Sequence, residues 1–167
     1  MKSTFINTFM LLSLALLLGQ CKPKLEGELG EPFDKVQGMA GTWQLSQFIQ
    51  KDLNNPIKEE RDLSYIYDNG VDLPLRLSFS TSDRSYDVEL TNGKNFFGES
   101  GTWSFDNDEV PSLLFLDDGN QVLSFELGSM VRPFDNQLSI ELLRGCLGGE
   151  SETETVIYIF KFNRVTE

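Results

Sequence analysis

The amino-acid sequence predicts an all-β fold, and specifically an eight-stranded antiparallel up-and-down β-barrel. Apolar and polar side chains alternate with a period of two through most of the chain after residue 40, which is typical of half-buried strands. Asn-Gly and Asp-Gly pairs, which favour tight hairpin turns, lie between the alternating segments. Eight strands with one apolar face each can close on one another and leave no unpaired edge. A two-sheet β-sandwich is the structural alternative.

The first expected strand, "GTWQLSQFI", covers residues 41–49. Its alternation places four side chains on one face: Trp43, Leu45, Gln47 and Ile49. Seven further strands follow the same rule, although both faces of the strand at 112–116 look apolar. They are expected at residues 74–80, 85–90, 101–105, 112–116, 121–127, 137–143 and 156–162.

Residues 56–70, "PIKEERDLSYIYDNG", interrupt this alternation. Pro56 can begin a short helix with a weak apolar face. A long loop that contains a single helical turn is the alternative interpretation of the same residues.

The opening stretch, "MKSTFINTFMLLSLALLLGQC", has the features of a secretory signal peptide. One positive charge, Lys2, precedes an apolar run from Phe9 to Leu18 that is too short to span a bilayer. The letters "LLGQC" are similar to the lipobox of bacterial lipoproteins, although Gln20 stands where that motif usually has a smaller side chain. The similarity implies that Cys21 is lipidated. The expected parts of the chain are a signal peptide at 1–20, a lipidated flexible tether at 21–38 and a barrel domain at 39–167.

The composition disfavours several classes of function. The 167-residue chain has a formal net charge of −12, which disfavours binding to nucleic acid. It contains no histidine, so a Ser-His-Asp or Cys-His catalytic arrangement is impossible and zinc sites lack their commonest ligand. If Cys21 is lipidated, Cys146 is left as an unpaired and buried thiol. The acidic turns at 106–109 and 117–120 lack the spacing of a calcium-binding EF-hand. We therefore expect no enzyme activity, no metal and no cofactor.

Two segments share three letters: "GTWQL" at 41–45 and "GTWSF" at 101–105. The first resembles the "GxW" entry of lipocalins. The order "GTWQL", "LSFSTSDRSYDVEL", "SGTWSFDND" and "SLLFLDDG" resembles the lipocalin-like domain of Gram-negative bacterial lipoproteins over about residues 39–127. The resemblance implies that Trp43 and Trp103 pack across a barrel end. The sequence around the two copies is not duplicated, so they are two uses of one motif and not a repeat.

Two groups of aromatic side chains are candidates for a binding site. The first group is expected to face the barrel interior, where it either lines a pocket for an apolar ligand or forms a packed core. It comprises Trp43, Phe79, Tyr86, Trp103, Phe125 and Phe160. The second group lies in loops, where it either stacks on a carbohydrate or plugs the barrel mouth. It comprises Tyr65, Tyr67, Phe96 and Phe97. We favour a cavity at one end of the barrel, capped by residues 56–70 and the loop at 96–97.

These features predict a lipid-anchored, non-enzymatic protein of the cell envelope. Lys22, and not Asp, follows Cys21, and by resemblance to sorted lipoproteins this favours the outer membrane. The expected role is to bind a small apolar ligand, or to act as a structural or interaction module with an envelope protein partner. The alternative is a carbohydrate-binding or accessory module of an outer-membrane uptake system.

Overall fold

The fold was analysed in a computed structural model, which describes residues 31–55, 57–68, 70, 75–129, 131–146 and 153–165. The expected signal peptide, its lipidation site Cys21 and most of the expected tether lie outside these residues. All of the described residues except Glu31 belong to one compact unit, Pro32–Glu167. The described residues of this unit are all-β apart from two short helical segments, as the sequence predicts.

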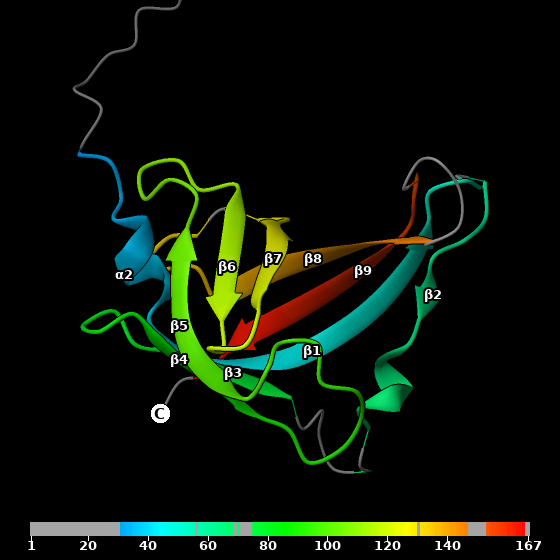
Figure 1. Ribbon diagram of the computed structural model, residues 1–167, viewed down its shortest axis with the longest axis horizontal. Coiled ribbons are helices and arrows are strands. Elements are labelled where there is room, and N and C mark those ends of the chain that lie inside the picture. The colour runs from blue at the N-terminus through cyan, green and yellow to red at the C-terminus, as the bar shows by residue number, and fades with distance from the viewer. Residues whose placement is uncertain are drawn as a thin grey trace, which may run out of the picture. The chain divides into compact units, whose positions relative to one another are not determined.

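Eight strands form the closed antiparallel barrel, in which each strand pairs with the next and the first pairs with the last (Figure 1). They are β1 (Gly41–Asp52), β3 (Arg76–Phe79), β4 (Ser85–Glu89), β5 (Ser100–Phe105), β6 (Leu113–Asp117), β7 (Val122–Leu127), β8 (Gln137–Cys146) and β9 (Thr153–Arg164). The predicted barrel is therefore confirmed, and the alternative of a two-sheet sandwich is not. A ninth strand, β2 (Arg61–Asp62), pairs only with the far part of β1.

The interruption expected at 56–70 is a loop that contains β2 and one turn of 3₁₀ helix, η1 (Ser64–Ile66). The turn is attached to β1, because the Ser64 hydroxyl accepts a hydrogen bond of 2.9 Å from the backbone N–H of Phe48. This agrees with the interpretation of a long loop with one helical turn. Pro56 lies outside the described residues.

The predicted alternation of β1 is wrong in the second half of that strand. The pairing of β1 with β9 shifts register between Leu45 and Gln47, so that Ser46 is the extra residue of a β-bulge. After the bulge, Phe48 points into the core cluster. Ile49 is buried outside that cluster, and Gln47 bonds to Asp62 on β2. Simple period-two counting fails here because one inserted residue exchanges the two faces of the strand.

A short helix, α2 (Lys35–Met39), covers one end of the barrel (Figure 1). Asp34 caps it, with its carboxylate accepting a 3.0 Å hydrogen bond from the backbone N–H of Gln37. Gly38 permits close packing, because a Cβ at this position would lie 2.9 Å from the backbone of Arg132. The ordered fold thus includes residues that the sequence analysis placed at the end of the tether.

The up-and-down order assigns each connection to one of two barrel ends. The α2 end carries α2 and the connections at 80–84, 106–112 and 128–136. The opposite end carries the described residues of the connections at 53–75, 90–99 and 118–121.

Candidate functional site

The two "GTW" tryptophans both lie near the α2 end and are almost completely buried. The indole N–H of Trp43 donates a 2.9 Å hydrogen bond to the carbonyl of Met39, beside α2. The indole N–H of Trp103 donates a 2.9 Å hydrogen bond to the carbonyl of Ser80, in the β3–β4 turn. Each ring thus joins the core to backbone at the barrel end, which satisfies its only polar atom.

An arginine covers each of these rings. The guanidinium carbon of Arg164 lies 4.2 Å from the ring centroid of Trp43, and that of Arg84 lies 4.8 Å from the ring of Trp103. Both distances suit a cation–π interaction. Arg84 is one-third exposed and also forms a two-pronged ion pair with Asp108, with bonds of 2.9 and 3.3 Å.

Arg164 is held more tightly than Arg84. Its guanidinium donates hydrogen bonds to the carbonyls of Ala40 at 2.5 Å, Gly38 at 2.7 Å and Asp135 at 3.1 Å. Burial lowers the pKa of Arg164 from its usual value, and the charge of Asp135 partly opposes this effect. Arg164 therefore ties three segments together at the α2 end: the entry to β1, the β7–β8 connection and the end of β9.

The glycines of the two motifs serve different physical needs. Gly41 has a φ of +108°, a backbone conformation that residues with a side chain rarely adopt. Gly101 is required by a close approach of strands, because a Cβ there would lie 1.9 Å from the carbonyl oxygen of Asp117. The Gly-Thr-Trp motif therefore brings a buried indole to the α2 end in both strands. Its glycine is required for backbone conformation in the first copy and for close packing of strands in the second.

The barrel interior is filled by side chains. All six residues predicted to line it are buried and belong to one core cluster: Trp43, Phe79, Tyr86, Trp103, Phe125 and Phe160. Phe79 contacts two others, with centroid distances of 6.5 Å to Tyr86 and 5.8 Å to Trp103. This packing favours the core, one of the two interpretations that the sequence left open.

Phe97 is the side chain that plugs the barrel. It comes from the β4–β5 connection, yet it is fully buried. Its ring stacks on Phe125 at 5.0 Å and meets the edge of Phe160 at 4.9 Å. The Tyr86 hydroxyl donates a 3.0 Å hydrogen bond to the Phe97 carbonyl and so fixes the loop from inside the barrel. Burial, together with the charges of Asp118 and Asp117, raises the pKa of Tyr86 to about 12.

The other three loop aromatics occupy different environments. Tyr67 is fully buried against the ring of Phe48, and its hydroxyl donates a 2.6 Å hydrogen bond to the Lys94 carbonyl. Burial raises the pKa of Tyr67 well above its usual value. Phe96 is half-buried. Tyr65 is 69% exposed. The structure therefore brings Tyr67, Phe96 and Phe97 to the opposite end, and leaves Tyr65 on the surface.

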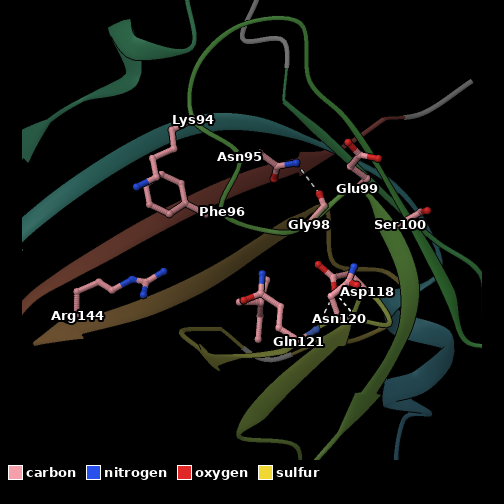
Figure 2. Close-up of a pocket in the computed structure, with 11 residues that line it drawn as sticks. Lys94, Asn95, Phe96, Gly98, Glu99, Ser100, Asp118, Asn120, Gln121 and Arg144 are labelled. Atoms are coloured by element: carbon pink, nitrogen blue, oxygen red, sulfur yellow. Dashed lines mark hydrogen bonds between the residues drawn. The ribbon is translucent and has the colours of Figure 1, made fainter.

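An open groove of about 630 Å³ lies beside this plug at the opposite end (Figure 2). One wall comes from the β4–β5 connection and the first residue of β5. The second comes from the β6–β7 turn, and β7 and β8 each add one side chain. The lining residues are Lys94, Asn95, Phe96, Gly98, Glu99, Ser100, Asp118, Asn120, Gln121, Leu123 and Arg144. Of the aromatic residues predicted from the sequence as binding-site candidates, Phe96 is the one that lines this groove.

Internal hydrogen bonds hold both walls of the groove in place. The Asn95 side chain accepts a 2.9 Å bond from the N–H of Phe97 and donates a 2.6 Å bond to the Gly98 carbonyl. Across the groove, the Asp118 carboxylate accepts bonds from the backbone N–H groups of Asn120 at 2.8 Å and Gln121 at 2.9 Å. These bonds lower the pKa of Asp118. The groove is therefore a preformed surface.

The chemistry of the groove is polar, with one aromatic component. The exposed side chains of Asn120, Gln121 and Ser100 offer amide and hydroxyl groups that both donate and accept hydrogen bonds. Lys94 and Arg144 bring positive charge to its rim (Figure 2). The Lys94 ammonium lies 5.0 Å from the centroid of the Phe96 ring. Such a surface suits a polar, hydroxyl-bearing ligand better than an acyl chain.

Other kinds of site find no support in the described residues. That part of the chain contains no group of three or more Cys, His, Asp or Glu side chains placed to hold a metal ion. Within the same residues, no helix has the length and apolar character to cross a bilayer.

Comparison with known proteins adds a family. No curated protein gives a significant match to this sequence. A family model described as a domain of unknown function, DUF5004, matches residues 24–127, which is more than half of the chain. The match runs from the expected tether to the end of β7 and includes both tryptophan motifs. The chain therefore belongs to the DUF5004 family.

Proposed function

We propose that this protein is a lipid-anchored, non-enzymatic binding module of the cell envelope, and that it acts through its surface and not through a ligand enclosed in the barrel. The observation that carries this proposal is the position of Phe97, which fills the space between Phe125 and Phe160. Since an eight-stranded barrel has room for only one small ligand, a plug of this size removes most of that room.

The binding surface in this proposal is the open groove beside Phe96. Its ligand is an oligosaccharide segment, because amides, hydroxyls and an aromatic ring are the groups that recognise sugar hydroxyls and sugar faces. The strong net negative charge of the chain, −12, disfavours long acidic polymers as partners. Carbohydrate binding is the alternative role that the sequence predicts. Here it is assigned to one groove and not to the four loop aromatics together.

The anchoring part of the proposal rests on the sequence alone. The signal peptide and the lipobox-like "LLGQC" support a lipid on Cys21, and Lys22 supports transfer to the outer membrane. Growth with a radioactive fatty acid tests it. The native chain should incorporate the label and a Cys21→Ser chain should not. Label in the Cys21→Ser chain would contradict the lipobox interpretation.

The groove is tested by measuring the binding of the purified full chain to an array of oligosaccharides. For any sugar that binds, the combined change Asn120→Ala and Gln121→Ala should weaken affinity about tenfold or more, because it removes two amide groups that contact the ligand. Gln137→Ala is the matched control, since it removes an exposed amide at the α2 end. Absence of binding to every sugar, or equal losses in both variants, would contradict the proposal.

The interior is tested separately with a fluorescent fatty acid. The filled core predicts no saturable binding by the native chain. Saturable binding that Phe125→Trp abolishes would place the ligand inside the barrel and would contradict a surface role.

A further inference from the structure

The α2 end carries an exposed aromatic pair that the core does not use. Phe33 precedes α2, and Phe134 lies in the β7–β8 connection. The two rings meet edge to face with centroids 5.0 Å apart. Phe33 is nevertheless 50% exposed and Phe134 57% exposed, and neither belongs to the core cluster. Two large rings that share one exposed site are an unusual use of apolar surface on a protein this acidic.

Basic groups lie over both rings. The Lys35 ammonium is 5.7 Å from the centroid of Phe33, and the Arg132 guanidinium carbon is 4.9 Å from that of Phe134. Arg132 is held in place by Asp135, through bonds of 2.9 and 3.0 Å. A hollow of about 510 Å³ next to Phe134 includes Arg132 and Asp135 in its lining. The site thus combines apolar rings, cations and a fixed backbone.

The position of the pair along the chain limits how far it can lie from the expected anchor. Phe33 follows Cys21 by twelve residues. Because each extended residue spans at most about 3.5 Å, the Cα atom of Phe33 remains within about 42 Å of the Cα atom of Cys21. A tether this short keeps the effective concentration of the pair at the bilayer surface high, so that weak contacts suffice to dock it.

We propose that the Phe33–Phe134 pair inserts into the interface of the bilayer to which Cys21 is anchored. This inference rests on the lipid anchor of the proposed function. Aromatic rings favour the headgroup level of a membrane, and Lys35 and Arg132 can contact lipid phosphates there. Docking through the α2 end directs the groove at the opposite end away from the lipid, where a soluble ligand can reach it.

Brominated lipids test this contact. The full chain is purified from a Gram-negative host, its acylation at Cys21 is measured by mass spectrometry, and it is placed in vesicles of phosphatidylethanolamine and phosphatidylglycerol. Phe134→Trp adds an indole at the pair, and Phe33→Trp is the second variant. Tyr65→Trp is the matched control, because Tyr65 is 69% exposed at the opposite end. The native Trp43 and Trp103 are buried and supply the background.

The indoles added by Phe134→Trp and Phe33→Trp should lose much of their emission to bromine near the headgroups, and should resist acrylamide in vesicles. The indole added by Tyr65→Trp should show the reverse. An acylated chain in which all three variants behave alike would overturn the membrane contact and would leave a protein partner as the occupant of the pair. A chain without an acyl group on Cys21 would overturn both the anchor and this inference.

Discussion

Arg164 and Trp43 face each other across the seam where the barrel closes. They are direct partners in the pairing of β9 with β1, and the guanidinium carbon lies 4.2 Å from the centroid of the ring. The same guanidinium donates hydrogen bonds to the backbone carbonyls of Ala40 and Asp135. Because the first and last strands meet here, this contact fixes closure of the barrel as well as burial of the ring.

Arg164→Met should therefore destabilise the domain by about 3 kcal/mol, because three backbone carbonyls lose a charged donor and the ring loses its cation. Arg84→Met is the matched control. Arg84 covers Trp103 in a similar way, but the ion pair of Arg84 with Asp108 is exposed. The Arg84→Met change should therefore lower the free energy of unfolding by about 1 kcal/mol or less. Urea unfolding followed by circular dichroism measures both changes. Equal effects would show that the tight hydrogen bonding of Arg164 adds nothing.

Trp43→Ala and Trp103→Ala should each lower the free energy of unfolding by about 3–5 kcal/mol, because each leaves a large cavity at the α2 end. In the native protein, acrylamide should quench indole fluorescence only weakly, since both rings are almost fully buried. Free quenching by acrylamide in the folded state would contradict the burial of Trp43 and Trp103 at the α2 end.

Gly101→Ala should cost about 3 kcal/mol or more, because the added methyl group overlaps the carbonyl oxygen of Asp117 and forces β5 away from β6. Gly119→Ala should cost only about 1–2 kcal/mol. Its φ of +83° is unfavourable for alanine, but no atom lies within 4 Å of the new group. Thermal unfolding of the two variants gives the comparison, and the reverse order would be inconsistent with the close approach at Gly101.

Phe97→Ala should destabilise the protein by about 3–5 kcal/mol and open an apolar cavity beside Phe125 and Phe160. A cavity with apolar walls stays dry and takes up small apolar molecules. The variant should therefore gain binding of benzene or a short fatty-acid probe that the native protein lacks, as measured by calorimetry. Phe134→Ala, at an exposed ring, is the control and should gain none. A native chain that binds the probe as well as the variant would rule out the plug.

Stability should fall as the pH rises from about 10 to 12. The pKa of Tyr86 is raised to about 12 by burial and by Asp118 and Asp117, whereas an unfolded tyrosine ionises near pH 10. In this window the unfolded chain binds fewer protons than the folded one, so the stabilising difference present below pH 10 is lost. Tyr86→Phe should be less stable at pH 8 but less sensitive to alkali. Urea midpoints across this range measure the slope, and an unchanged slope would disprove this role.

The sequence by itself determined the eight strands of the barrel and, apart from the second half of β1, which of their faces point inward. Each strand carries its own alternation, and that local pattern survives folding because a half-buried strand needs one apolar face whatever its neighbours are. The positions of Phe79, Tyr86 and Phe125 in the core follow from this pattern alone. So does the burial of Trp43 and Trp103, which the resemblance to lipocalins also implies.

Tertiary structure decided what depends on contacts between distant segments. The bulge at Ser46 arises in the pairing of β1 with β9. As a result, Phe48 and not Ile49 points into the core cluster. No local pattern marks this position, because the extra residue is defined only by the partner strand. The same holds for Arg164, whose closure contact joins the two ends of the fold.

The groove and the inward position of Phe97 could not be predicted from the sequence for a related reason. A loop aromatic such as Phe97 has the same local pattern whether it points into the barrel or onto a ligand. Its direction is set by Tyr86 and Asn95, which bind the loop backbone from inside and outside. Asn120 and Gln121 look like ordinary turn residues, and they become part of a groove only because the β4–β5 connection lies across from them. Local periodicity thus predicts the inward faces of the regular strands. Only packing decides whether a loop ring such as Phe97 is buried, and whether the interior side chains enclose a cavity or fill it.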